Sequence, residues 1–124
     1  MNRTLAAGAL LAGFAVAAGA FGTHGLRALL SAEALGWWQT AVQYQMWHGL
    51  ALVALGSAGR GGTWVPRLLG AGAVVFAATL YTMALGGPRW LGAVTPLGGL
   101  LMLAGWGLLA VQALRGPQPS GTSG

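Results

Sequence analysis

The sequence contains no cysteine and no lysine, and Glu33 is its only side-chain carboxylate. Without cysteine, the chain can form neither disulfides nor thiolate metal sites. A single carboxylate rules out two-carboxylate acid–base catalysis within one chain and a carboxylate-rich Ca²⁺ or Mg²⁺ site. The motifs of hydrolases and of phosphate-binding loops are also missing. We therefore predict that the protein is not an enzyme and has neither a metal site nor a cofactor.

Charge of either sign is scarce, because charged residues make up 6% of the 124 residues and hydrophobic residues make up 56%. Soluble domains have about 25% charged residues, and a chain of this length needs such a surface to stay in water. The net charge is +5, but the arginines are spread between apolar segments and do not form a phosphate-binding surface. The composition indicates a membrane protein and argues against nucleic-acid binding.

Four apolar segments are long enough to cross a bilayer as helices, at about 4–22, 38–57, 65–85 and 96–114. Roughly 20 helical residues at about 1.5 Å each span a hydrocarbon core of about 30 Å. The first segment also resembles a signal peptide, with Ala18-Gly19-Ala20 as its cleavage site, but it continues beyond that site and we expect it to be retained. The sequence predicts an all-α fold, a four-helix transmembrane bundle in a single domain of residues 1–114.

The connections between these segments are less regular. Residues 23–37 fit either a short interface helix or an irregular loop, with Trp37 and Trp38 anchored at the lipid headgroups. A glycine-rich loop at 56–62 separates the second and third segments, and Pro96 is well placed at the first position of the fourth helix. Residues 115–124 are rich in proline, serine and glycine, and we predict that they are disordered.

The arginines predict how the bundle is oriented. One side of the membrane would carry four of them and the other side only two, one of which Glu33 offsets: Arg3, Arg60, Arg67 and Arg115 against Arg27 and Arg89. Because positive residues are enriched in cytoplasmic loops, both termini are predicted to be cytoplasmic. A composition rich in arginine, alanine and glycine indicates a GC-rich bacterial genome, so we expect a multi-pass protein of the bacterial inner (plasma) membrane.

Glycine is unusually abundant, because it accounts for 23 of the 124 residues, whereas its average share in proteins is about 7%. Apolar surface alone does not bring helices together within lipid, so membrane helices associate through close van der Waals contact at small residues. The glycines predicted to pack helices together are Gly19, Gly22, Gly98, Gly99 and Gly105.

Polar side chains within the predicted spans are few and lie mostly in their non-cytoplasmic halves. On a helix, Tyr44, Gln45 and His48 share one face, and Gln39 and Gln43 fall nearly opposite. An imidazole near the bilayer midplane needs a partner. The candidate polar cluster consists of His24, Gln39, Gln43, Tyr44, Gln45, His48, Thr79, Tyr81, Thr82 and Thr95. These side chains either hydrogen-bond between helices, or line a small cavity in which His48 binds a ligand or accepts a proton.

Two stretches of the chain resemble a known family. Gly19–Leu26 (GAFGTHGL) and Gly36–His48 (GWWQTAVQYQMWH) resemble the domain of unknown function 423 family, also called the YgdD family, with eukaryotic relatives called transmembrane protein 256. Residues 80–85, 95–99 and 104–106 are similar to its second half. The family often has Gly-Ala-His where this chain has Gly22-Thr23-His24. The resemblance implies a four-span membrane protein without an assigned activity, and it singles out His24, Tyr44, Gln45 and His48.

Two functions remain open at this point. The first is a non-enzymatic packing or accessory component of the membrane, whose partners would be membrane lipids, further copies of itself or a larger membrane complex. The second is a small-solute or proton-linked transport element that acts as an oligomer through the outward-facing polar cluster around His48, since the chain is too small for a large inverted-repeat transporter.

Overall fold

A computed structural model describes residues 1–116 of the chain. It contains α1 (Arg3–Phe21), α2 (Ala32–Ala58), α3 (Trp64–Ala84) and α4 (Thr95–Arg115), with a π-helical turn η1 (Gly22–Leu26) before α2 and a 3₁₀ turn η2 (Arg89–Ala93) before α4. No strand occurs in the described part, so the predicted all-α, four-helix fold is confirmed. The tail predicted to be disordered lies outside the described residues from residue 117 onward.

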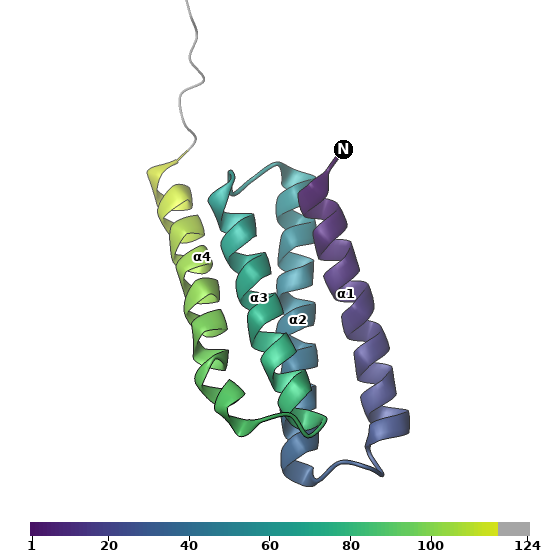
Figure 1. Ribbon diagram of the computed structural model, residues 1–124. Coiled ribbons are helices and arrows are strands. Elements are labelled where there is room, and N and C mark those ends of the chain that lie inside the picture. The colour runs from purple at the N-terminus through teal and green to yellow at the C-terminus, as the bar shows by residue number, and fades with distance from the viewer. Residues whose placement is uncertain (117–124) are drawn as a thin grey trace, which may run out of the picture.

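The helices are antiparallel and pack in chain order, α1 on α2, α2 on α3 and α3 on α4 (Figure 1). Within residues 1–116, α1 and α4 do not pack against each other. Residues 1 and 116 lie at the same end of the bundle, which we call the terminal end; the α1–α2 and α3–α4 connections lie at the loop end (Figure 1). α1 and α4 therefore expose most of their apolar surface.

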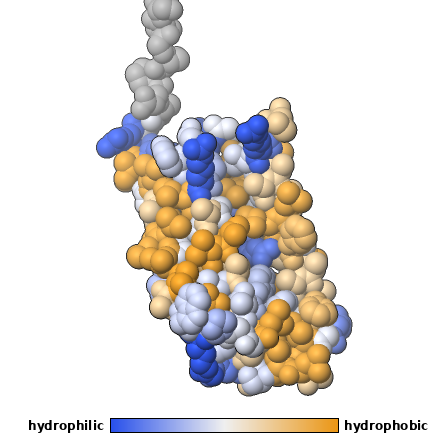
Figure 2. Space-filling view, viewed as in Figure 1, coloured by the Kyte–Doolittle hydropathy of each residue, from blue (hydrophilic) through white to orange (hydrophobic). Residues whose placement is uncertain are grey.

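The exposed surface is suited to lipid. Three helical segments are long and apolar enough to cross a membrane, namely Arg3–Leu26, Trp64–Ala84 and Arg89–Arg115. α2 is more polar than these segments, but it has 27 residues and packs along both α1 and α3. It therefore crosses the same thickness of membrane as they do. Figure 2 shows hydrophobic residues over much of the middle of one face, strongly hydrophilic residues at its two ends and one hydrophilic patch at mid-height. The protein is a transmembrane bundle.

α1 and α2 meet at glycines that allow backbone-to-backbone contact. A Cβ atom added to Gly8 would lie 2.6 Å from the carbonyl oxygen of Gly49, and one added to Gly56 would lie 2.6 Å from the amide nitrogen of Leu5. Such close approach provides the van der Waals contact that holds membrane helices together. Gly8, Gly49 and Gly56 were not among the glycines predicted from the sequence.

The α3–α4 interface is built in the same way. A Cβ on Gly98 would lie 2.7 Å from the carbonyl oxygen of Gly72, and a Cβ on Gly105 would lie 2.8 Å from the Leu69 side chain. Gly99 faces away from α3, with nothing within 4 Å of a Cβ placed there.

The other two predicted glycines lie between α1 or η1 and α2. A Cβ on Gly22 would lie 2.7 Å from the indole ring of Trp38, whereas one on Gly19 would make an ordinary contact of 3.4 Å with Val42. Only the first of these two positions therefore requires glycine for space.

α2 begins at Ala32, well before the predicted start of the second span near Trp38. The Ser31 side chain caps the helix by accepting a hydrogen bond from the amide of Ala34 at 3.1 Å, and Glu33 lies in the first turn, where the helix dipole favours a negative charge. Residues 23–37 are therefore a turn followed by the start of α2. Trp38 is buried rather than anchored at the headgroups, because its ring packs beneath Tyr81 with ring centroids 4.6 Å apart.

Candidate functional site

Gln45 lies in the middle of α2 and joins three helices. Its Nε2 donates a hydrogen bond to the backbone carbonyl of Leu11 in α1 at 2.9 Å, and the hydroxyl of Tyr81 in α3 donates to its Oε1 at 2.8 Å. The residue is only 7% exposed. A carboxamide offers both donors and an acceptor, and both kinds of group are engaged here. Gln45 therefore positions α1 and α3 relative to α2.

His48 lies one helical turn further along α2, and both of its ring nitrogens have partners. The indole N–H of Trp106 in α4 donates to Nε2 at 3.0 Å, and Nδ1 lies 2.8 Å from the carbonyl oxygen of Tyr44. An indole nitrogen can only donate, so Nε2 is the acceptor and the ring proton is assigned to Nδ1, which donates to the carbonyl. The imidazole is buried, and its hydrogen bond with Trp106 links α4 to α2.

Further hydrogen bonds join α3 to α4 and add a second link between α1 and α2. The hydroxyl oxygens of Thr79 in α3 and Thr95 in α4 lie 2.8 Å apart, and the indole N–H of Trp38 donates to the carbonyl of Ala18 in α1 at 2.8 Å. No buried side-chain nitrogen or oxygen in residues 1–116 lacks a hydrogen-bond partner. The buried polar groups of this region are thus used to hold the helices together.

The other members of the predicted cluster lie outside this network. His24 is exposed in η1, and Gln39 and Gln43 are exposed on the face of α2 that points away from Gln45. Thr82 is exposed and donates to the carbonyl of Ala78 in its own helix at 2.7 Å. Tyr44 is half-buried and stacks on His48, with ring centroids 6.1 Å apart. The cluster predicted from the sequence therefore divides into a hydrogen-bonded network, four exposed residues, and Tyr44, which packs on His48.

Two tryptophans carry hydrogen bonds that sequence reasoning missed. Trp38 was predicted to be an interface anchor and no hydrogen bond was predicted for Trp106, yet each donates between helices. The signal was present, because an indole N–H within a membrane needs an acceptor. The sequence alone did not show which acceptor faces each ring.

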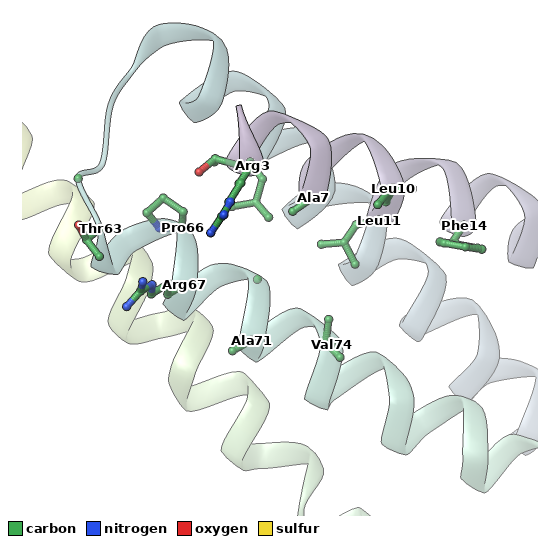
Figure 3. Close-up of a pocket in the computed structure, with 14 residues that line it drawn as sticks. Arg3, Ala7, Leu10, Leu11, Phe14, Thr63, Pro66, Arg67, Ala71 and Val74 are labelled. Atoms are coloured by element: carbon green, nitrogen blue, oxygen red, sulfur yellow. The ribbon is translucent and has the colours of Figure 1, made fainter. Parts of the chain in front are cut away.

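A groove runs between α1 and α3 on the face drawn in Figure 3. Its volume is about 640 Å³, and Arg3 and Arg67 stand at its terminal end. A second groove of about 470 Å³ continues between the same helices toward the loop end, and Phe14 lines both. Apart from Gln45 and Tyr81 in the second groove, the walls beyond the arginines are apolar. The grooves suit a long apolar group better than a polar solute.

Residues 18–99 match the model of a family described as a protein of unknown function, DUF423. The chain belongs to the DUF423 family. It is 46% identical over 112 residues to a UPF0382 membrane protein of Staphylococcus saprophyticus, a match that covers 87% of this chain and 93% of that relative. It is also 41% identical over 113 residues to the UPF0382 inner membrane protein YgdD of Escherichia coli K12, covering 86% of each chain. No solved structure matches the chain.

Membership in this family of membrane proteins agrees with the transmembrane helices of the structure. The predicted family and the localisation in the bacterial inner (plasma) membrane are thus confirmed. The names of the relatives assign no biochemical activity.

Proposed function

We propose that this DUF423 protein is a non-enzymatic accessory component of the membrane that associates laterally with another transmembrane protein. A second copy of the chain is the partner that its surface fits best. The observation that carries the proposal is an exposed stripe on α2, in which two glutamines occur at membrane depth. The α2 stripe recurs at three- and four-residue spacing and consists of Gly36, Gln39, Gln43, Trp47, Leu50 and Ala54.

The depth of the two glutamines follows from the ends of the helix. Glu33 forms an exposed ion pair with Arg89 at 3.0 Å, which belongs in water or among headgroups. Gln39 and Gln43 lie six and ten residues further on, about 9 and 15 Å along the axis. A hydrocarbon core of about 30 Å therefore places Gln43 well inside it. A side-chain amide that faces lipid at this depth without a hydrogen-bond partner is unfavourable by several kcal/mol, which is on the order of the free energy of transferring an amide from water to cyclohexane.

A second copy relieves this cost with the groups that are present. Two copies inserted in the same direction bring identical residues to the same depth, and a two-fold axis places the same surface on both sides of the interface. A carboxamide both donates and accepts, so Gln43 can pair with Gln43 of the second copy, and Gln39 likewise. Interhelical hydrogen bonds of this kind stabilise membrane helix pairs.

Crosslinking in intact membranes tests the proposal, because the chain has no cysteine of its own. Neither Gly36 nor Gly99 has anything within 4 Å of an added Cβ, and each is the fifth residue of its helix, near the loop end. Gly36→Cys should form a disulfide-linked dimer, and Gly99→Cys on α4 is the matched control. Adding Gln39→Leu and Gln43→Leu should reduce the Gly36→Cys dimer severalfold. Equal crosslinking at both cysteines, or no effect of the leucines, would show the proposed association to be wrong.

The alternative function, a transport element centred on His48, has less support. Its central requirement is a histidine that is free to bind or accept a proton, and both nitrogens of His48 are hydrogen-bonded. If His48→Ala abolished a solute or proton flux in liposomes while the bundle stayed folded, transport would replace the present proposal.

A further inference from the structure

We infer that the groove between α1 and α3 binds an anionic phospholipid, with its phosphate at Arg3 and Arg67 and one acyl chain along the apolar walls. The inference goes beyond the proposed function, because it concerns a lipid and not a second protein. The groove lies between α1 and α3, whereas the α2 stripe faces away from Gln45, which itself lines the continuation of the groove. A lipid and a second copy therefore use different surfaces.

The two arginines form a paired positive site. Arg3 is the first residue of α1 and Arg67 lies in the first turn of α3, and Figure 3 shows the two at the same end of the groove on neighbouring helices. Glu33, the only side-chain carboxylate, lies at the loop end with Arg89. No side-chain carboxylate of the chain therefore neutralises this pair. Guanidinium groups are well suited to phosphate oxygens, which they bind through two parallel hydrogen bonds.

A tryptophan places these arginines at headgroup level. The guanidinium carbon of Arg67 lies 5.6 Å from the ring centroid of Trp64, which is itself exposed. Tryptophan is enriched at the boundary between the headgroups and the hydrocarbon. The positive end of the α3 dipole lies in the same turn and favours an anion. The end of the groove thus matches the depth at which a phospholipid carries its phosphate.

The body of the groove matches an acyl chain. Its walls carry Leu10, Leu11, Phe14 and Val74, while small residues such as Ala71 leave the space open (Figure 3). From Arg3 to Phe14 the axis of α1 advances about 16 Å, which is close to half of a hydrocarbon core of about 30 Å. Half of the hydrocarbon core is the thickness of one leaflet, and this is also the depth that one acyl chain spans.

The two arginines and the apolar groove together favour a lipid over a free anion as the ligand. Inorganic phosphate would engage the arginines and leave the apolar groove unused. Two cations facing one phosphate favour a headgroup with net negative charge, such as phosphatidylglycerol, over zwitterionic phosphatidylcholine. Basic pockets between transmembrane helices bind anionic lipid headgroups by this electrostatic preference.

Native mass spectrometry of the full-length protein, with phosphatidylglycerol or phosphatidylcholine added in equal amounts, tests the inference. We expect the protein to retain phosphatidylglycerol in preference to phosphatidylcholine. Arg3→Gln and Arg67→Gln should each weaken the binding of phosphatidylglycerol about 5-fold, and the double variant should weaken it about 30-fold, at roughly 1 kcal/mol per arginine. Arg60→Gln is the matched charge control, because Arg60 lies at the same end but does not line this groove. An equal loss with Arg60→Gln would show a general surface effect and overturn the site.

A groove-filling variant tests the apolar part separately. Ala71→Leu keeps both arginines but occupies the groove, and it should lower retention of phosphatidylglycerol severalfold, whereas Ala78→Leu, on an exposed part of α3 outside the groove, should not. Unchanged retention with Ala71→Leu, or displacement of the lipid by inorganic phosphate, would overturn the inference. The same spectra give the masses of monomer and dimer, so loss of lipid with the dimer intact leaves the proposed function standing.

Discussion

Replacing Gly98 by alanine tests whether backbone contact between α3 and α4 determines the stability of the bundle. The added Cβ would lie 2.6 Å from the amide nitrogen of Phe76 and 2.7 Å from the carbonyl oxygen of Gly72. Both are backbone atoms, so neither can rotate away as a side chain could. Favourable contacts begin at about 3.5 Å, so the two helices must separate by about 1 Å. Gly99→Ala, one residue further on, places the same methyl group where nothing lies within 4 Å.

The expected cost follows from that separation. A gap of up to about 1 Å removes a quarter to a half of the dispersion energy of the atoms it parts, and overpacking of this kind costs about 1–3 kcal/mol. The same movement would stretch the 2.8 Å contact between Thr79 and Thr95 beyond hydrogen-bonding distance, at about 0.6 kcal/mol more. We therefore expect Gly98→Ala to lower the free energy of unfolding by about 2–3 kcal/mol. Gly99→Ala should be neutral or stabilising by up to about 1 kcal/mol, because alanine favours helix.

The measurement is reversible unfolding in mixed micelles, followed by helical circular dichroism, for the wild-type protein and both variants at one lipid-to-detergent ratio. The adjacent positions share helix, depth and chemistry, so their difference isolates the contact. If the two variants unfolded within about 0.5 kcal/mol of each other, close approach at Gly98 would contribute nothing measurable, and the account of the α3–α4 interface would be wrong.

Two hydrogen bonds yield further predictions in the same assay. Tyr81→Phe removes the hydroxyl that donates to Gln45 and should cost about 0.6 kcal/mol, with a coupling of similar size in a double-mutant cycle with Gln45→Leu; additive effects would show that the bond contributes no stability. Trp106→Phe removes the donor to His48 and should cost about 1 kcal/mol from lost bonding and packing, and His48→Ala should then cost less in the Trp106→Phe protein than in the wild type. An equal cost in both backgrounds would contradict the pairing.

The fold could be predicted because its determinants are local. Apolar length, scarce charge and glycine-rich turns specify four helices, and Pro96 marks the start of α4 within one residue. The apolar span was predicted to begin near Trp38, where hydrophobicity begins, whereas α2 itself begins at Ala32, where the Ser31 cap and a first turn containing Glu33 set the helix start. Capping is a hydrogen-bond signal, and a search for apolar length does not detect it.

The contacts between helices could be predicted only in part. Helical spacing separates Gln45 and His48 from Gln39 and Gln43, and the structure places the two pairs on opposite faces. The partners Leu11 and Trp106 could not be found in the same way, because they depend on how far each helix is rotated and shifted against its neighbour. The backbone carbonyl of Leu11 illustrates the limit, since every residue has one and no side-chain pattern distinguishes it.

α2 is the most polar helix of the bundle, and the polar residues on its buried face and on its exposed face have different explanations. On the buried face, Gln45 and His48 have partners on neighbouring helices, and the stability of the bundle is sufficient reason for them. That reason does not extend to Gln39 and Gln43, which are exposed at depths where the outer helices present apolar side chains such as Phe14 and Leu100. A helix selected only to fold within lipid would carry leucine at both positions, since an amide facing hydrocarbon is costly. An interaction outside the single chain would explain both glutamines, and this supports the proposal that the protein meets its partner through the α2 stripe.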